Sequence, residues 1–166
     1  IVDKTEQFVL SDGKWNFDPS TVVTLKAEKG NVEAAAFYQA ITDWVKENHP
    51  EYVTSYGNSD YYYGGSAYNN NFDFRPSAWK AQNASAYGSM SDADLTKWMF
   101  ERLPGAFLPG LKAIYGSADV VEGVDVFYTI NFAIYDGSST TQYTIKYKVT
   151  GKGQFEYVAD SLKKVE

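Results

Sequence analysis

Two segments of the chain place apolar residues at the spacing of an amphipathic helix. In the first segment, over 32–48, the apolar stripe consists of Phe37, Ile41, Trp44 and Val45. These positions correspond to i, i+4, i+7 and i+8, which lie on one face of a helix. Asn31 is a candidate N-cap, since its side-chain oxygen can accept from the first free amides. We predict a helix over 32–48 that ends at His49-Pro50, because proline disfavours the helical conformation of the residue before it.

The second helical segment covers about 91–115. Residues 91–94 read Ser-Asp-Ala-Asp, which resembles a capping box with Asp in place of the usual Glu. The apolar face that follows consists of Leu95, Trp98, Met99 and Leu103. Pro104 and Pro109 interrupt the face, because proline lacks the backbone donor of a helical residue. We therefore predict a kinked or two-piece helix that reaches about Tyr115.

The last third of the chain alternates apolar and polar residues with a period of two. The alternation covers 124–134 and 142–149, and a further strand signal follows at 155–158. Turn sequences rich in Gly, Ser and Asp separate these stretches. The pattern predicts three antiparallel strands in a meander with one face in water.

Shorter strand signals precede the first helix, at 8–10, 15–17 and 21–26. With the two helices and the meander they predict an α+β fold in a single domain over 1–166. We expect a mainly antiparallel sheet with a C-terminal three-strand meander and both helices packed on one face of it.

Composition narrows the chemistry that such a domain can perform. A chain of 166 residues can build a core without disulfides or metal. It contains no cysteine, which excludes thiol catalysis, disulfides and cysteine-bearing zinc sites. His49 is the single histidine, so motifs with two histidine ligands are absent. We predict no metal and no cofactor, and no motif selects a catalytic residue.

Charge and hydropathy indicate which partners to expect. The chain has 15 Lys and Arg against 21 Asp and Glu, a net charge of −6, and no basic stripe, so we expect no nucleic-acid partner. No apolar run is long enough to span a bilayer, so we predict no transmembrane segment. No signal peptide opens the sequence, and from Ile1 we expect a mature product whose targeting segment is absent from this chain.

Tyrosine is unusually frequent, with 14 Tyr against 10 Phe and 4 Trp. The segment 52–75 holds six of these tyrosines, together with four Asn and three Gly. Rigid rings mixed with small polar residues are typical of antibody paratopes, so the segment predicts a recognition surface for a glycan or a flexible peptide. A structural interpretation also stays open, because tyrosine favours strands and 61–63 could alternate between core and solvent. The candidate contacts are Tyr61, Tyr62, Tyr63, Tyr68, Asn70 and Asp73, with Trp79 as a stacking platform.

The leading hypothesis is therefore a non-catalytic extracytoplasmic binding or interaction module, associated with glycans. One alternative is a small carboxylate-dependent enzyme acting on glycans, for which Asp60, Asp73 and Glu122 are available although no spacing selects a pair. A second alternative is an assembly domain of a larger surface protein, whose exposed aromatic residues are covered by a partner.

Residues 61–75 read Tyr-Tyr-Tyr-Gly-Gly-Ser-Ala-Tyr-Asn-Asn-Asn-Phe-Asp-Phe-Arg. This run resembles a segment of uncharacterised secreted or lipid-anchored proteins of gut anaerobic bacteria. The resemblance implies a location in the periplasm or at the cell surface and a role beside glycan-handling systems, and it brings no catalytic residues with it. The order of helix and curled sheet is also similar to cystatin-like and nuclear-transport-factor-like folds, an analogy that does not establish function.

Overall fold

The computed structural model describes residues 8–11, 14–17, 19–53, 65–66 and 69–165. Over these residues the chain forms an α+β fold, as predicted. The helices are α1 (Val32–Asn48), the short 3-10 helix η1 (Pro50–Tyr52), α2 (Pro76–Gln82), α3 (Ala84–Tyr87) and α4 (Asp92–Tyr115). The strands are β1 (Phe8–Ser11), β2 (Lys14–Phe17), β3 (Thr21–Thr24), β4 (Gly65–Ser66), β5 (Asn71–Asp73), β6 (Phe127–Tyr135), β7 (Thr140–Gly151), β8 (Gln154–Tyr157) and β9 (Lys163–Lys164).

Seven of these strands form one mixed, mostly antiparallel sheet. Its main path is β4-β5-β6-β7-β8, while β3 pairs with β6 and β9 pairs with β7. The meander β6-β7-β8 is antiparallel throughout, which confirms the prediction for the last third of the chain. The pairings of β3 and β5 with β6 are parallel. Strands β1 and β2 form a separate two-stranded sheet.

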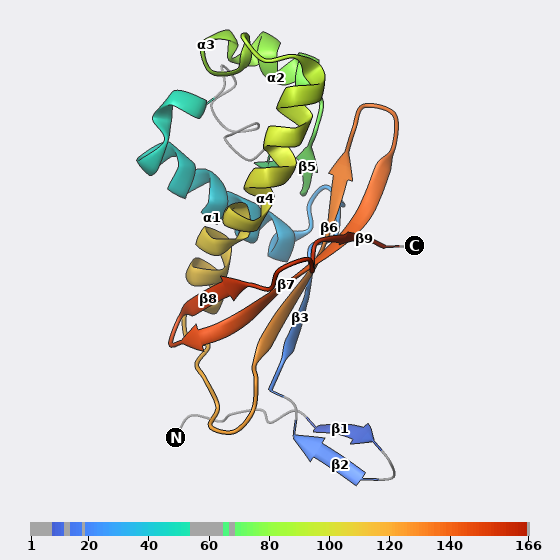
Figure 1. Ribbon diagram of the computed structural model, residues 1–166, viewed down its shortest axis with the longest axis vertical. Helices are drawn as coiled ribbons and strands as arrows, with labels where there is room; N and C mark the ends of the chain where they lie inside the picture. Colours follow the sequence, from blue (N-terminus) through green and yellow to red (C-terminus); the bar gives the residue numbers. More distant parts are fainter. Residues whose placement is uncertain (1–7, 12–13, 18, 54–64, 67–68, 166) are drawn as a thin grey trace.

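Helices α1 and α4 lie on one face of the sheet, as Figure 1 shows. The face of the meander that they cover carries Ile130, Phe132, Ile145 and Tyr147, all fully buried. Phe107 of α4 packs against Phe132, with ring centroids 4.7 Å apart. These contacts place the hydrophobic core between the sheet and the two helices, in the arrangement that the alternating pattern predicts.

Local capping sets where the two long helices begin. Asn31 Oδ1 accepts from the Ala34 amide at 3.0 Å, and Ser91 Oγ accepts from the Asp94 amide at 3.1 Å. Both residues have extended backbones, as N-caps require. His49 is the C-cap of α1, directly before Pro50. The predicted helix starts and the end at His49 are therefore confirmed.

Of the two alternatives predicted for the second helix, the two-piece form is wrong, because α4 continues through both prolines as one helix of 24 residues that ends at Tyr115, as predicted. Tertiary contacts hold it together at these positions. The Tyr147 hydroxyl donates to the Pro104 carbonyl, which ties the helix to β7. Gly110, one residue after Pro109, faces the Phe37 ring so closely that an added Cβ would lie 2.4 Å from Phe37 Cε1. Packing thus offsets the backbone hydrogen bonds that the prolines cannot make.

No helix within the described part of the chain combines the length and the apolar character needed to cross a membrane.

Candidate functional site

All four tyrosines proposed from the sequence as ligand contacts lie outside the described residues. These are Tyr61, Tyr62, Tyr63 and Tyr68. Asn70, Asp73 and Trp79 are described, and all three are buried.

Trp79 is a core residue and offers no exposed ring for stacking, because its side chain is 1% exposed. Its Nε1 donates to the Asp73 carbonyl at 2.7 Å. The indole packs between Phe74 and Tyr87, with ring centroids 6.3 and 5.1 Å away. A stacking platform needs a solvent-accessible face, so the sequence-based role of Trp79 is wrong in this structure.

Asn70 and Asp73 likewise make internal bonds. Asn70 Nδ2 donates to the carbonyls of Glu28 and Asn31, at 2.7 and 3.2 Å. The Asp73 carboxylate accepts from Arg75 Nε and Nη2 at 2.7 and 2.5 Å, a bidentate ion pair. Arg75 also covers the ring of Tyr135 at 5.5 Å from the centroid. The two side chains hold segments of the fold together and leave little polar surface for a ligand.

A groove that the sequence does not predict lies between α1 and α4. Its volume is about 590 Å³, within the range of roughly 300–1,000 Å³ that is usual for small-molecule sites. The lining residues are Ala40, Asp43, Trp44 and Glu47 from α1, and Gly105, Leu108, Pro109, Lys112 and Ala113 from α4. Since α1 and α4 cover the sheet with their inner faces, the groove opens on the side of the helix pair that the sheet leaves uncovered.

Close packing between α1 and α4 sets the separation of the two helices. Gly110 allows the Phe37 ring to contact α4, and Phe37 also packs on Phe107 with centroids 6.2 Å apart. Both aromatic residues are fully buried. Because protein interiors are close-packed, this contact makes the groove a rigid feature of the helix pair.

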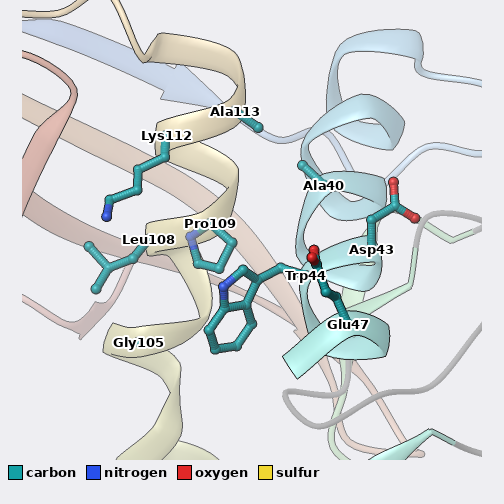
Figure 2. A pocket seen from close by; sticks show the side chains of 9 residues that line it. All are labelled: Ala40, Asp43, Trp44, Glu47, Gly105, Leu108, Pro109, Lys112 and Ala113. Carbon is teal, nitrogen blue, oxygen red and sulfur yellow. The ribbon is translucent and has the colours of Figure 1, made fainter. Parts of the chain in front are cut away.

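Trp44 forms the centre of the groove. Figure 2 shows its indole extending from α1 towards α4, where it lies beside Pro109. The side chain is half-buried, while its stripe neighbours Ile41 and Val45 are fully buried. His49 contacts the indole from the end of α1, with ring centroids 5.3 Å apart. Trp44 therefore presents part of an aromatic surface whose position is fixed by packing.

Charged groups stand on both walls of the groove. Asp43 and Glu47 are exposed carboxylates one turn apart on α1, and Lys112 is an exposed ammonium group on α4. Asp43 Oδ1 accepts from Gln39 Nε2 at 2.9 Å, which orients that carboxylate. In Figure 2 the Glu47 side chain lies beside the indole, whereas the Asp43 carboxylate points away from α4 and the Lys112 ammonium group points away from α1.

Pro109 adds a backbone acceptor to this set. Proline has no amide hydrogen, so Pro109 cannot donate to the Gly105 carbonyl, four residues earlier in α4. Gly105 is half-buried and lines the groove. The carbonyl consequently lacks its regular helical donor and can accept from a bound molecule.

Sequence reasoning missed this site because it assigned Trp44 to the buried stripe of its helix. Residue 44 lies at the border of the stripe, between Asp43 and a second acid one turn later, Glu47. An aromatic residue next to two carboxylates on one helical face is the feature of the sequence that could have indicated this site. The opposite wall, from α4, becomes visible only when the helices are packed.

The described residues contain no group of three or more histidine or acidic side chains that could hold a metal ion. No protein-family model matches the chain, and neither a curated protein nor a solved structure matches it significantly.

Proposed function

We propose that this chain is a non-catalytic binding module that holds a carbohydrate in the groove between α1 and α4. The observation that carries the proposal is the half-exposed indole of Trp44 in a groove of about 590 Å³ that is also lined by Asp43, Glu47 and Lys112. Sites for small molecules are mostly apolar with a few placed polar groups, and this groove has that composition.

A sugar ring complements these groups in two ways. Its C–H face is apolar and packs on an indole, which supplies large contact area at a fixed position. Its hydroxyls donate to the carboxylates of Asp43 and Glu47 and to the Gly105 carbonyl, and accept from Lys112. Hydrogen bonds to charged groups are the stronger ones, so the carboxylates supply orientation as well as affinity.

The positions of the acids favour binding over hydrolysis. Glycoside hydrolases place two carboxyl groups on either side of the bond that breaks. Asp43 and Glu47 lie one turn apart on one helix, and neighbours at i and i+4 share one wall. The charged residue that α4 contributes to the groove is Lys112, so no second carboxylate faces them from the opposite wall. An extracytoplasmic location, implied by the resemblance of residues 61–75, stays a prediction that accompanies this proposal.

The test is a panel of immobilised neutral oligosaccharides, followed by calorimetric titration with the free form of any that bind. Trp44→Ala should weaken binding by about 2 kcal/mol, close to thirtyfold in Kd, because it removes the central aromatic contact. Trp44→Phe should keep part of the affinity. Asp43→Asn and Glu47→Gln should each weaken binding, whereas Glu101→Gln, an exposed acid of α4 outside the groove, should not.

Circular dichroism on each variant checks that the fold is intact. Failure of every oligosaccharide to bind the wild-type chain would overturn the proposal. Binding that Trp44→Ala leaves unchanged would place the carbohydrate site elsewhere, and would overturn it for this groove. A preference for basic peptides over sugars would show that the carboxylates serve a cationic ligand instead.

A further inference from the structure

The Glu47 carboxylate lies beside the Trp44 indole in the groove between α1 and α4 (Figure 2). The two residues are three positions apart on α1, and side chains at this spacing are neighbours on a helix surface. Glu47 is exposed, and none of the ion pairs in the described part of the chain involves its carboxylate. An unpaired carboxylate therefore lies next to a half-exposed aromatic ring.

The other ionisable groups around the indole do not neutralise Glu47. The Asp43 carboxylate adds a second negative charge to α1, and the Lys112 ammonium group points away from α1. His49 contacts the indole, but its Nδ1 lies 3.3 Å from Glu51 Oε1, so a protonated imidazole is paired with that acid. The wall of the groove that carries Trp44 consequently has an excess of negative charge, on a chain whose net charge is −6.

Two uncharged features of the groove also attract a cation. The face of an aromatic ring carries partial negative charge, and among aromatic side chains tryptophan attracts ammonium groups most strongly. The Gly105 carbonyl, which lacks its helical donor because of Pro109, presents a second partial negative charge. A carboxylate, an indole face and a backbone carbonyl thus offer the same polarity within one groove of about 590 Å³.

We propose that the carbohydrate held in this groove carries a free amino group, as an oligosaccharide of glucosamine does. This inference rests on the carbohydrate proposal for the same groove and names the class of sugar. The C–H face of the sugar ring packs on the indole of Trp44, and the protonated amine donates to the Glu47 carboxylate and the Gly105 carbonyl. An ammonium group has three donors and no acceptor, which matches polar groups that accept.

The same groups discriminate against other sugars. N-acetylation removes the charge of the amine and two of its three donors, so it removes both the ion pair and the attraction to the indole. A uronic acid would place its carboxylate near Glu47, where like charges repel each other. For oligosaccharides of equal length we therefore expect affinity to fall from glucosamine to N-acetylglucosamine to galacturonic acid.

Calorimetric titration with two tetrasaccharides, one of glucosamine and one of N-acetylglucosamine, tests the inference. Both are measured in one slightly acidic buffer, in which the sugar amine is protonated, at an ionic strength that screens distant carboxylates. The glucosamine form should bind about tenfold more tightly, since a cation–π contact and an exposed ion pair each contribute about threefold. A tetrasaccharide of galacturonic acid should bind more weakly than both.

Two matched variants locate the origin of this preference. Glu47→Gln keeps the shape of the side chain and removes its charge, so the preference for the glucosamine form should fall from about tenfold to about threefold. Glu33→Gln removes the same charge from the first turn of α1, outside this groove, and should leave the preference at about tenfold. Binding of the N-acetylated form to both variants shows that their fold is intact.

Equal affinity of the wild-type chain for the two tetrasaccharides overturns this inference and leaves the carbohydrate proposal in place. A preference that Glu47→Gln leaves unchanged, or that Glu33→Gln lowers as much, also overturns it, because Glu47 then does not recognise the amine. Tetralysine that binds more tightly than the glucosamine form overturns it too, since charge without a sugar ring is then sufficient. Failure of both tetrasaccharides and of every neutral oligosaccharide overturns the two proposals together.

Discussion

The C-terminal meander and the segment that joins α1 to α4 are held in place by different kinds of contact. β6 pairs with β7 along its whole length, from Phe127 opposite Lys148 to Tyr135 opposite Thr140. The turn between them is short, and the Asp136 side chain accepts from the amides of Ser138 and Ser139 at 2.8 and 2.9 Å. The meander is thus stabilised by many backbone bonds between neighbours in sequence.

The joining segment, over 69–90, contains only short elements. β5 has three residues, α2 has seven and α3 has four. Elements of this length are not stable alone, because helix nucleation is unfavourable and few backbone bonds form. Single side chains tie the segment to distant backbone instead: Asn70 to the Glu28 carbonyl, Trp79 to the Asp73 carbonyl and Asn83 to the Glu51 carbonyl.

Packing of buried aromatic rings also keeps this segment in place. Phe72 packs against Tyr38, Phe107 and Phe132, with centroids 5.3, 5.3 and 5.7 Å away. Tyr87 contacts Trp98 at 5.8 Å. The stability of the meander is therefore distributed over a ladder of backbone hydrogen bonds, while that of the joining segment depends on a few side chains. Single substitutions in the joining segment should therefore have the larger effects.

The largest loss of stability should come from Trp79→Ala. Truncating a fully buried indole leaves a cavity and should cost about 3–5 kcal/mol of unfolding free energy, measured by urea denaturation. Trp79→Phe should cost less and still leave the Asp73 carbonyl without its donor. Tyr147→Phe removes a comparable donor from the meander and should cost about 1 kcal/mol. Equal losses for the two Phe variants would contradict the contrast between the regions.

Asn70→Ala should have the next largest effect. Asn70 has a φ of 56°, and its side chain supplies the donors to the Glu28 and Asn31 carbonyls. Alanine adds left-handed strain and removes both side-chain hydrogen bonds to these carbonyls, at a total of about 2–4 kcal/mol. Asp160 has a similar φ of 61° but is exposed near the end of the meander, so Asp160→Ala should cost only about 1 kcal/mol. A smaller loss for Asn70→Ala than for Asp160→Ala in the same denaturation assay would refute this expectation.

The smallest effect should be the pH dependence of the β6–β7 turn. The amides of Ser139 and Ser138 hold the pKa of Asp136 below its ordinary value of 3.8. A lowered folded-state pKa means that the stabilisation is present above pH 3.8 and is lost as the pH falls through the folded value. Thermal melts in acid should show a melting temperature that falls as the pH is lowered. Asp136→Asn should make this fall smaller. The shift should be small because the group is fully exposed. If the melting temperature of Asp136→Asn falls with pH as steeply as that of the wild-type chain, Asp136 is not the cause of the loss.

Much of the fold follows from local pattern. The caps at Asn31 and Ser91 and the two-residue alternation of the meander each depend on neighbours in sequence. The helices α2 and α3 were not predicted, because their few turns are stabilised by contacts with residues far along the chain. The parallel pairings of β3 and β5 with β6 were missed for the same reason, since alternation within a strand says nothing about its neighbour.

The candidate site likewise could not be predicted from the local sequence pattern. Trp79 carries the apolar character that the sequence suggests, but packing against Tyr87 places its ring in the core. Trp44 was assigned to a buried stripe, and the approach of α4 at Gly110 leaves it half-exposed in a groove. Which aromatic ring is available to a ligand depends on which surfaces the helices cover.

The two long helices, the meander and the absence of thiol chemistry follow from the sequence alone, because periodicity, capping and composition can be read without knowledge of the tertiary structure. The groove at Trp44, the continuity of α4 through its prolines and the parallel pairing of β3 with β6 depend on the tertiary structure. Each of these features joins residues that are distant in sequence, and their positions are set by the close packing of helices and sheet.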